Sequence, residues 1–227
     1  MKVTYHGQSC FIIENEAHRI IVDPFLSGNP NACITPDDVD VSHVLLTHGH
    51  ADHVLDAEAI ARRCDAVIIA PNELANYYGD KGLNIHPMHL GGKHDFPFGR
   101  VKLTLAFHGS GIETENGFIY VGPPCGFLIT MGGKTLYHAG DTGLFGDMKI
   151  IGQLNDIDVA LLPIGDNFTM GPEDALLAAE WVRAKHAIPM HYNTFPLIAQ
   201  DGVQFASDLK AKGIDGIALK VGESAEF

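Results

Sequence analysis

The sequence predicts a layered α/β protein in which two mixed sheets pack face to face with helices outside. Strand-like and helix-like segments alternate in the first and last thirds of the 227-residue chain, which is typical of parallel strand–helix–strand units. In the middle, strand-like segments follow one another with glycine turns between them, which indicates antiparallel sheet. A total of about a dozen strands is more than one open sheet accommodates comfortably, and two sheets are therefore favoured.

The first third contains apolar, β-branched runs separated by polar turns. We predict strands over 10–13, 19–22, 41–47 and 66–70. Residues 57–63 lack helix breakers and are predicted to form a helix. The order of strand 41–47, helix 57–63 and strand 66–70 predicts a parallel βαβ unit.

The middle and last thirds differ in pattern. Strands are predicted over 101–107, 118–121, 126–130 and 134–137, all within one antiparallel region. The segment Met131-Gly132-Gly133-Lys134 is suited to a tight hairpin turn between two of them. After these, the chain is predicted to form strand 159–163, helix 172–183, strand 187–190 and helix 205–212.

Composition limits the classes of function. Hydrophobic residues make up 46% and charged residues 19%, and no low-complexity linker divides the chain, so we expect one domain over residues 1–227. The net charge of −13 disfavours nucleic acid and anionic membrane surfaces as partners. With no membrane-length apolar run and no visible secretory leader, we expect a cytoplasmic protein that acts on a small molecule, and a homo-oligomer remains open.

The segment Thr47-His48-Gly49-His50-Ala51-Asp52-His53 is the strongest chemical signal. It places three imidazoles and a carboxylate directly after a predicted buried strand. His48 and His50 are two apart and point the same way on an extended backbone, whereas Asp52 and His53 project in another direction. One loop can therefore supply two adjacent metal ions. Imidazole and carboxylate ligands suit zinc, and iron or manganese less selectively.

One loop cannot complete two metal sites, so further ligands must come from elsewhere. His108, Asp141 and His191 each follow a predicted strand, and strand ends are where functional residues collect in layered α/β folds. Taken singly, each has an ordinary explanation as a packed histidine or a turn carboxylate.

The chain resembles the metallo-β-lactamase superfamily over nearly its whole length, because the motifs of that superfamily occur in it in the same order. The matching motifs are Asp23 after the second strand, the His48–His53 loop, His108, Gly140-Asp141-Thr142 and His191. Segments 163–174 and 189–196 further resemble a bacterial and archaeal family of metal-dependent hydrolases, whose nearer kin include L-ascorbate-6-phosphate lactonase. The fold that this resemblance implies is a four-layer αββα sandwich.

The resemblance also implies a ligand set. His48, His50 and His108 would hold the first metal, Asp52, His53 and His191 the second, and Asp141 would bridge both. Asp23 would orient the histidine loop from behind. Lactonase-like relatives often carry Gly-His near the first strand, whereas this chain has His6-Gly7-Gln8. We expect His6 to take a supporting position behind the ligands.

The function implied is hydrolysis of a small ester, lactone or phosphoester. Two divalent ions about 3.5–4 Å apart would hold a shared water and lower its pKa, and Asp52 would orient this water and accept its proton, so that hydroxide is the nucleophile. Iron-dependent oxidation and a non-catalytic metal-binding module are the alternatives. Di-iron relatives usually have glutamate where this chain has His50, which favours hydrolysis.

Substrate contacts are harder to predict. Asn167, Thr169 and Asn193 follow strands and are candidates, although Asn and Thr also cap helices and form turns. The glycine-rich loop 109–117 directly follows His108 and is expected to form a lid or a subunit contact.

Overall fold

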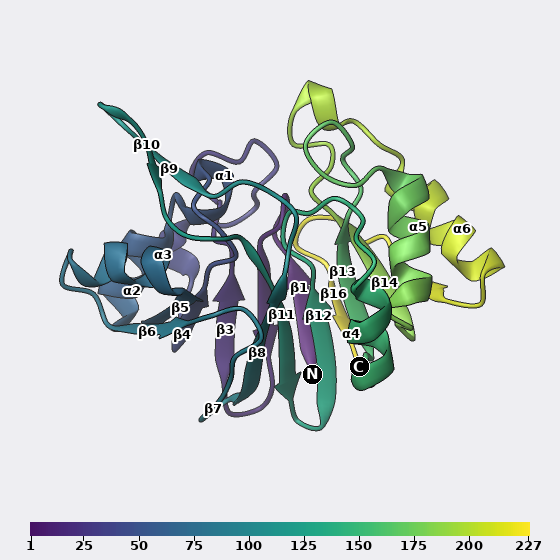
Figure 1. Ribbon diagram of the computed structural model, residues 1–227, viewed down its shortest axis with the longest axis horizontal. Helices are drawn as coiled ribbons and strands as arrows, with labels where there is room; N and C mark the ends of the chain where they lie inside the picture. Colours follow the sequence, from purple (N-terminus) through teal and green to yellow (C-terminus); the bar gives the residue numbers. More distant parts are fainter.

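The computed structural model describes residues 1–227 and contains two seven-stranded sheets, which overlap at the centre of Figure 1. In spatial order, the first sheet consists of β16 (Ser224–Glu226), β1 (Lys2–Tyr5), β2 (Phe11–Glu14), β3 (Arg19–Val22), β4 (His43–Leu45), β5 (Val67–Pro71) and β6 (Ile85–Met88). The second consists of β15 (Asp215–Gly216), β14 (His186–Met190), β13 (Val159–Pro163), β12 (Lys134–His138), β11 (Cys125–Met131), β8 (Gly99–Leu105) and β7 (Lys93–Phe96). A separate two-stranded ribbon is formed by β9 (Gly111–Thr114) and β10 (Gly117–Tyr120).

Helices cover the outer face of each sheet (Figure 1). Beside the first sheet lie α1 (Ala51–Val54), α2 (Ala57–Cys64) and α3 (Asn72–Gly79). Beside the second lie α4 (Met148–Leu154), α5 (Pro172–Trp181) and α6 (Gly202–Ala211). Single turns of 3₁₀ helix occupy Pro36–Asp38 and Pro196–Ile198. No helix combines the length and the apolar character that crossing a membrane requires.

Three apolar layers hold the four structural layers together. The inner layer joins the two sheets and contains Phe11 from the first and Phe127 from the second, both fully buried. One outer layer packs Ile60 of α2 against the first sheet, and the other packs Phe205 of α6 against the second. Alternating strand residues supply both faces of each sheet, as the pleat requires. This arrangement confirms the predicted αββα sandwich.

The local predictions hold where the apolar pattern is strong. β4 and β5 are parallel neighbours joined through α2, as the βαβ prediction requires. The hairpin β11–β12 closes through Gly132 and Gly133, both at positive φ, and pairs Met131 with Lys134. Positive φ at both central residues is the turn geometry that glycine permits.

Other predictions were wrong or incomplete. The strand predicted at 118–121 does not join the central antiparallel sheet; it is β10, which pairs only with β9. β10 is exposed along its length, so its apolar composition does not reflect burial in a sheet. We did not predict β7, because the sequence Lys93–Phe96 is mostly polar and lies at a sheet edge, where apolar periodicity is absent. The short elements β6, β9, β15, β16, α1, α3 and α4 also lacked a separate prediction.

Strand direction determines where the site forms. β3, β4 and β5 run parallel, and so do β12, β13 and β14. β8 points the same way as β12, because both are antiparallel to β11. The carboxyl ends of these strands therefore meet along one edge of the sandwich, near α1 and far from the two chain termini (Figure 1).

Candidate metal centre

The structure brings all seven predicted ligands together at this edge. We call them the His/Asp cluster: His48, His50, Asp52, His53, His108, Asp141 and His191. His48 and His50 lie on the loop that follows β4, and Asp52 and His53 lie on α1, all in the half of the molecule that contains the first sheet. His108, Asp141 and His191 follow β8, β12 and β14 of the second sheet. The cluster thus spans the junction between the two sheets.

Three imidazoles form the first group. Nε2 of His48 lies 3.0 Å from Nδ1 of His50, and Nε2 of His108 lies 3.2 Å from that same Nδ1. A tetrahedral zinc ion with bonds of about 2.0–2.1 Å holds its ligand nitrogens about 3.3 Å apart. Both of these separations therefore match the spacing of ligands around one cation, and all three ligand atoms lie within 4.8 Å of one another.

Asp52, His53 and His191 form the second group. Oδ2 of Asp52 lies 3.6 Å from Nε2 of His53 and 3.5 Å from Nε2 of His191. All of the hydrogen bonds and ion pairs of Asp52 go to Oδ2. The side chain is 25% exposed, so its carboxylate borders the open space above the cluster.

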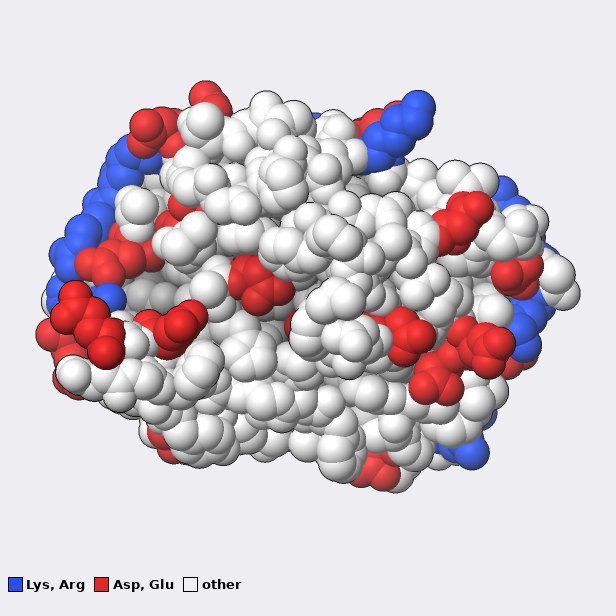
Figure 2. Space-filling view, turned by 90° about the horizontal axis from the view of Figure 1, so that it is seen from above, with Lys and Arg blue, Asp and Glu red and all other residues white.

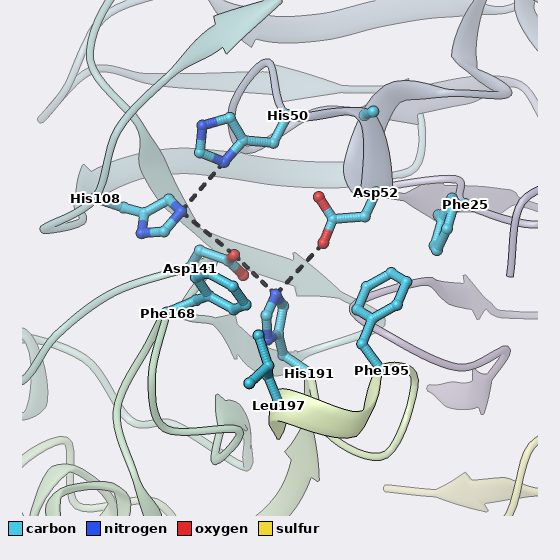
Figure 3. Close-up of a pocket in the computed structure, with 10 residues that line it drawn as sticks. Phe25, His50, Asp52, His108, Asp141, Phe168, His191, Phe195 and Leu197 are labelled. Atoms are coloured by element: carbon cyan, nitrogen blue, oxygen red, sulfur yellow. Dashed lines mark hydrogen bonds and ion pairs between the residues drawn. The ribbon is translucent and has the colours of Figure 1, made fainter. Parts of the chain in front are cut away.

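Asp141 lies between the two groups. Its Oδ2 is 3.0 Å from Nε2 of His191 and 3.3 Å from Nε2 of His53 in the second group. The same oxygen is 3.6 Å from Nε2 of His108 and 3.9 Å from Nε2 of His48 in the first. One carboxylate oxygen therefore faces both groups, which is the position of a bridging ligand. Figure 3 shows Asp141 at the centre of the pocket floor, between His108 and His191.

Asp23 holds the histidine loop from behind. This buried residue follows β3, and its Oδ2 accepts hydrogen bonds from Nδ1 of His53 at 2.8 Å and from Oγ1 of Thr47 at 2.7 Å. Oγ1 of Thr47 in turn lies 2.9 Å from Nδ1 of His48. Both imidazoles are thus bonded through Nδ1, which leaves the Nε2 lone pair free for a cation. The sequence indicated Asp23 but not the intermediate role of Thr47.

Gln8, rather than His6, reaches the cluster from the first-strand region. Nε2 of Gln8 donates to Oδ2 of Asp52 at 2.7 Å. The backbone carbonyl oxygen of Gln8 accepts from the backbone N–H of His191, also at 2.7 Å. His6 contacts none of the cluster residues through a hydrogen bond, and both of its buried ring nitrogens lack partners. The expectation for His6 is therefore wrong, because the turn at Gly7 carries the next side chain, Gln8, towards Asp52. In the sequence, the only feature that indicated this contact was the side-chain amide of Gln8, which can form hydrogen bonds although it cannot change protonation.

Non-glycine residues with positive φ border the cluster. Gln8 has φ of 52°, Asp23 of 47° and His191 of 55°. The left-handed region is uncommon for such residues and is maintained only where the surrounding contacts hold it. Here the hydrogen bonds between Gln8 and His191 and between Asp23 and Thr47 stabilise this backbone conformation.

Electrostatics divide the cluster into two kinds of imidazole. Burial lowers the pKa of His48, His50 and His108, which keeps these rings neutral. Burial acts in the same direction on His191 and His53, but the Asp141 carboxylate outweighs it and raises the pKa of both, that of His191 to about 9.

The two carboxylates are shifted in the complementary direction. Burial alone raises the pKa of a carboxyl group, but His191 and His53 outweigh it and hold the pKa of Asp141 well below its ordinary range. His53 and His191 likewise lower the pKa of Asp52 below its ordinary value. The cluster therefore presents ionised carboxylates together with imidazoles, which is the form in which carboxylates bind metals.

The residues present fit a pair of metal ions. Nε2 of His53 and Oδ1 of Asp141 are buried without a hydrogen-bond partner, although buried polar atoms are normally paired. Three overlapping groups of ligand atoms each lie within 4.8 Å of one another. A cation in the first group and another in the second would satisfy the unpartnered nitrogen of His53 and balance the carboxylates. Nitrogen and oxygen donors of this kind suit zinc.

A cavity of about 530 Å³ opens above the cluster. Its floor is formed by His50, Asp52, His108, Asp141 and His191, and its walls by Phe25, Ala51, Phe168, Phe195 and Leu197 (Figure 3). Ligand sites of proteins commonly have this size and an apolar lining with a few polar groups.

The proposed substrate contacts Asn167, Thr169 and Asn193 do not line this cavity. The side chain of Asn193 bonds the backbone of Gln200 at 2.9 Å through both its amide nitrogen and its oxygen, and Thr169 bonds the carbonyl oxygen of Met170. Asn167 is exposed, with φ of 48°. These side chains shape turns, as Asn and Thr commonly do, and their neighbours Phe168 and Phe195 face the cavity instead.

Loop 109–117 begins the β9–β10 ribbon, which projects from the body at the upper left of Figure 1. Its base is tied to the histidine loop, because the N–H of Gly49 donates to Oγ of Ser110 at 3.2 Å. Phe118 and Tyr120 of β10 are both more than 70% exposed. Its roles as a lid or subunit contact stay predictions.

Comparison with known proteins agrees with this geometry. Residues 18–192 match the family described as a beta-lactamase superfamily domain. The UPF0173 metal-dependent hydrolase YtkL of Bacillus subtilis is 59% identical over 229 residues, covering 100% of both chains. A UPF0173 metal-dependent hydrolase of Geobacillus is 59% identical over 228 residues, again covering 100% of both chains. Igni18, a metallo hydrolase from the hyperthermophilic archaeon Ignicoccus hospitalis, is 36% identical with a TM-score of 0.90, covering 100% of this chain and 98% of that one.

Fold and site, together with these relatives, define an enzyme of the metallo-β-lactamase superfamily that hydrolyses its substrate with the help of metal. Within that superfamily, the chain belongs to the UPF0173 family of metal-dependent hydrolases.

Proposed function

We propose that the His/Asp cluster holds two divalent cations, zinc in the native protein, and hydrolyses a small ester, lactone or phosphoester. His48, His50 and His108 would hold one cation, and Asp52, His53 and His191 the other. Asp141 would be shared. The observation that carries this proposal is the position of Asp141 Oδ2, which lies within 3.9 Å of an Nε2 atom in each group.

Bound in these positions, the cations would supply a nucleophilic water at neutral pH and would polarise the scissile carbonyl or phosphoryl group. The protein's own residues supply position and proton transfer. Gln8 holds Oδ2 of Asp52 through its 2.7 Å hydrogen bond, so that the carboxylate keeps one orientation beside the cavity. Asp23 and Thr47 fix the rings of His53 and His48.

Asp52 is the proposed proton acceptor. In ester hydrolysis, water adds to the carbonyl carbon, the bond to the leaving alcohol oxygen breaks, and a proton of the water passes through Asp52 to that alcohol. The lowered pKa of Asp52 keeps the carboxylate ionised and able to orient the water. Nothing in this route needs a serine or cysteine nucleophile.

Hydrolysis is favoured over iron-dependent oxidation by the ligand at position 50. His50 completes an all-imidazole first group, and this ligand set suits zinc. The second group is also complete, so both cations would be held by protein side chains. A small-molecule substrate agrees with the size of the cavity and with the net charge of −13, which disfavours nucleic acid.

Replacing the shared carboxylate tests the proposal. Asp141→Asn should reduce bound zinc from two ions per chain and lower kcat by at least about a hundredfold, because an amide is a poor bridging ligand. Metal analysis and hydrolysis of p-nitrophenyl acetate, a lactone and bis-p-nitrophenyl phosphate give the two readouts.

Asp147→Asn is the matched control, because Asp147 is exposed and lies later in the same loop. It should keep both metal content and activity. Two zinc ions per chain with undiminished turnover in Asp141→Asn would refute the assignment.

A further inference from the structure

We infer that the cavity selects substrates whose non-reacting part is uncharged and apolar, and that it disfavours anionic substrates such as phosphorylated ones. The inference rests on the proposed hydrolytic function and deepens it, because it concerns what lies beside the scissile bond. It narrows the proposed esters, lactones and phosphoesters to neutral acyl compounds.

The walls of the cavity are large apolar side chains left accessible to solvent. Phe168 is 51% exposed, Leu197 is 69% exposed and Phe195 is 38% exposed. Phe25 lies beside Phe195, with 6.4 Å between the two ring centroids. Contiguous exposed apolar side chains that border a cavity mark binding surfaces. Figure 3 shows Phe25 and Phe195 on the Asp52 side of the pocket and Phe168 on the Asp141 side.

Specific hydrogen bonds hold the segment that carries Phe25. Asp56, the residue directly before α2, accepts from the backbone N–H of Leu26 at 2.6 Å and from the hydroxyl of Ser27 at 2.6 Å. Asp56 is itself buried. The segment directly after Phe25 is thus anchored to the start of α2.

The two other wall segments are held in the same manner. Asn193 and Gln200 exchange two hydrogen bonds of 2.9 Å, which close the loop containing Phe195 and Leu197. The backbone N–H of Asp166 bonds the carbonyl oxygen of Met170 at 3.0 Å and closes the turn that carries Phe168. Anchored loops of this kind present the apolar side chains in a preformed arrangement, which favours binding.

The walls offer no cationic partner for an anion. None of the ten residues that line the cavity is lysine or arginine. Phosphate and carboxylate groups are usually bound by such side chains, above all by arginine. In Figure 2, which looks down on this edge of the molecule, Lys and Arg lie at the margins while uncharged and acidic residues occupy the middle.

The cations proposed for the floor do not change this conclusion. Their charge would be offset at close range by Asp52, Asp141 and Asp23, together with the nucleophile. The scissile group would occupy the floor, so a second anionic group would have to lie against Phe168, Phe195 or Leu197. Burying an ionised group against apolar surface without a partner is strongly unfavourable.

A pair of ligands that differ only in the tail tests the inference directly. Octanohydroxamic acid and the monohydroxamic acid of octanedioic acid share a metal-binding head and a chain length, but the second ends in a carboxylate. Titration calorimetry on the zinc-loaded protein should show that the apolar ligand binds at least about tenfold more tightly. Equal affinity, or tighter binding of the carboxylate ligand, would overturn the inference and leave the hydrolase proposal intact.

Substitutions locate the effect. Leu197→Ala should weaken octanohydroxamate binding about three- to tenfold, whereas Leu154→Ala should not change it. The control is well matched, because Leu154 is 71% exposed and lies outside the cavity. Leu197→Lys should reverse the order of the two ligands. Phe168→Ala should weaken octanohydroxamate binding in the same way, and Leu154→Ala serves as its control too.

The remaining outcomes are also decisive. Failure of both hydroxamates to bind a protein that contains two zinc ions would overturn the apolar site. A protein that binds no zinc would overturn the proposed function, and the inference with it; metal analysis of the same sample distinguishes this result from the others.

Discussion

Asp23 is the side chain that connects the histidine loop to the core of the first sheet. It is fully buried, and its two oxygens accept from His53, from the hydroxyl of Thr47 and from the N–H of Thr47. A carboxylate can accept all of these bonds at once, whereas an amide cannot. The orientation of two proposed ligands therefore depends on one acceptor that has no contact with the cavity.

Asp23→Asn should weaken zinc binding about 10- to 100-fold, because the amide N–H₂ group opposes the Nδ1–H of His53. Competition with a coloured chelator measures the affinity. Asp95→Asn, which alters an exposed ion pair with Arg100, is the control and should bind zinc as the unmodified protein does. Unchanged affinity in Asp23→Asn would show that the loop is held by other contacts.

His6 is a buried histidine whose two ring nitrogens have no partner. Burial, assisted by Arg19 and opposed by Glu14, lowers its pKa from 6.5 to about 4. The unfolded chain therefore binds more protons than the folded one between these values, and stability falls as pH decreases from 6.5 towards 4. At pH 5 this single group should cost about 2 kcal/mol relative to neutral pH.

His6→Leu should remove that part of the pH dependence. Urea unfolding of the metal-free variants at pH 7 and pH 5 measures it, and His89→Leu, at an exposed position, is the control. The free energy of unfolding of His6→Leu should fall less between the two pH values than that of the control. An equal fall in both variants would contradict the assignment.

At the scale of elements, the loop after β12 shows how closely the ligand-bearing turns are packed. Gly140 has φ of 65°, and a Cβ atom there would collide with the carbonyl oxygen of Cys125 on β11. Both the backbone conformation and the contact require glycine. The turn places Asp141 between the two groups of ligands, so its shape and the metal centre depend on each other.

Gly140→Ala should lower the free energy of unfolding by about 2–4 kcal/mol and reduce zinc content, because the backbone that carries Asp141 must shift. Gly143→Ala, in the same loop, meets nothing within 4 Å and should be tolerated. Chemical denaturation and metal analysis of the two variants test the difference. Equal stability and zinc content in both would disprove the packing argument.

At the scale of the whole molecule, the cluster joins the two sheets. Ligands from the first-sheet half meet ligands that follow β8, β12 and β14, so cations would link both halves of the sandwich. A ligand that binds only the folded state stabilises it, by about 4 kcal/mol at a concentration a thousandfold above Kd. For a chain of this length, such a change raises Tm by on the order of 10 °C.

Removal of metal by a chelator should therefore lower Tm by on the order of 10 °C, and zinc should restore it. Differential scanning calorimetry before and after dialysis, with metal content measured on the same samples, provides the test. If Tm stays constant while zinc is lost, the cations do not link the two halves.

Much of the fold was predictable because burial leaves a periodic trace in the chain. β13 lies at 159–163 as predicted, and its five residues are all buried. The same reasoning placed β10 incorrectly, because Phe118–Tyr120 are apolar yet exposed. Polar edge strands such as β7 carry no such pattern. Apolar residues therefore predict a strand correctly where they are buried in the core, as in β13. They mislead where apolar residues are exposed, as in β10.

By itself the sequence determined the order of strands and helices and the chemical character of the metal centre, since apolar spacing and ligand types are local properties of a chain. Only the tertiary structure decided which distant side chains meet: Gln8 with Asp52, Thr47 between Asp23 and His48, and the apolar walls around the cavity. These contacts join residues far apart in the chain, and their geometry follows from how two sheets pack and where their strand ends converge. No short segment of sequence carries that information.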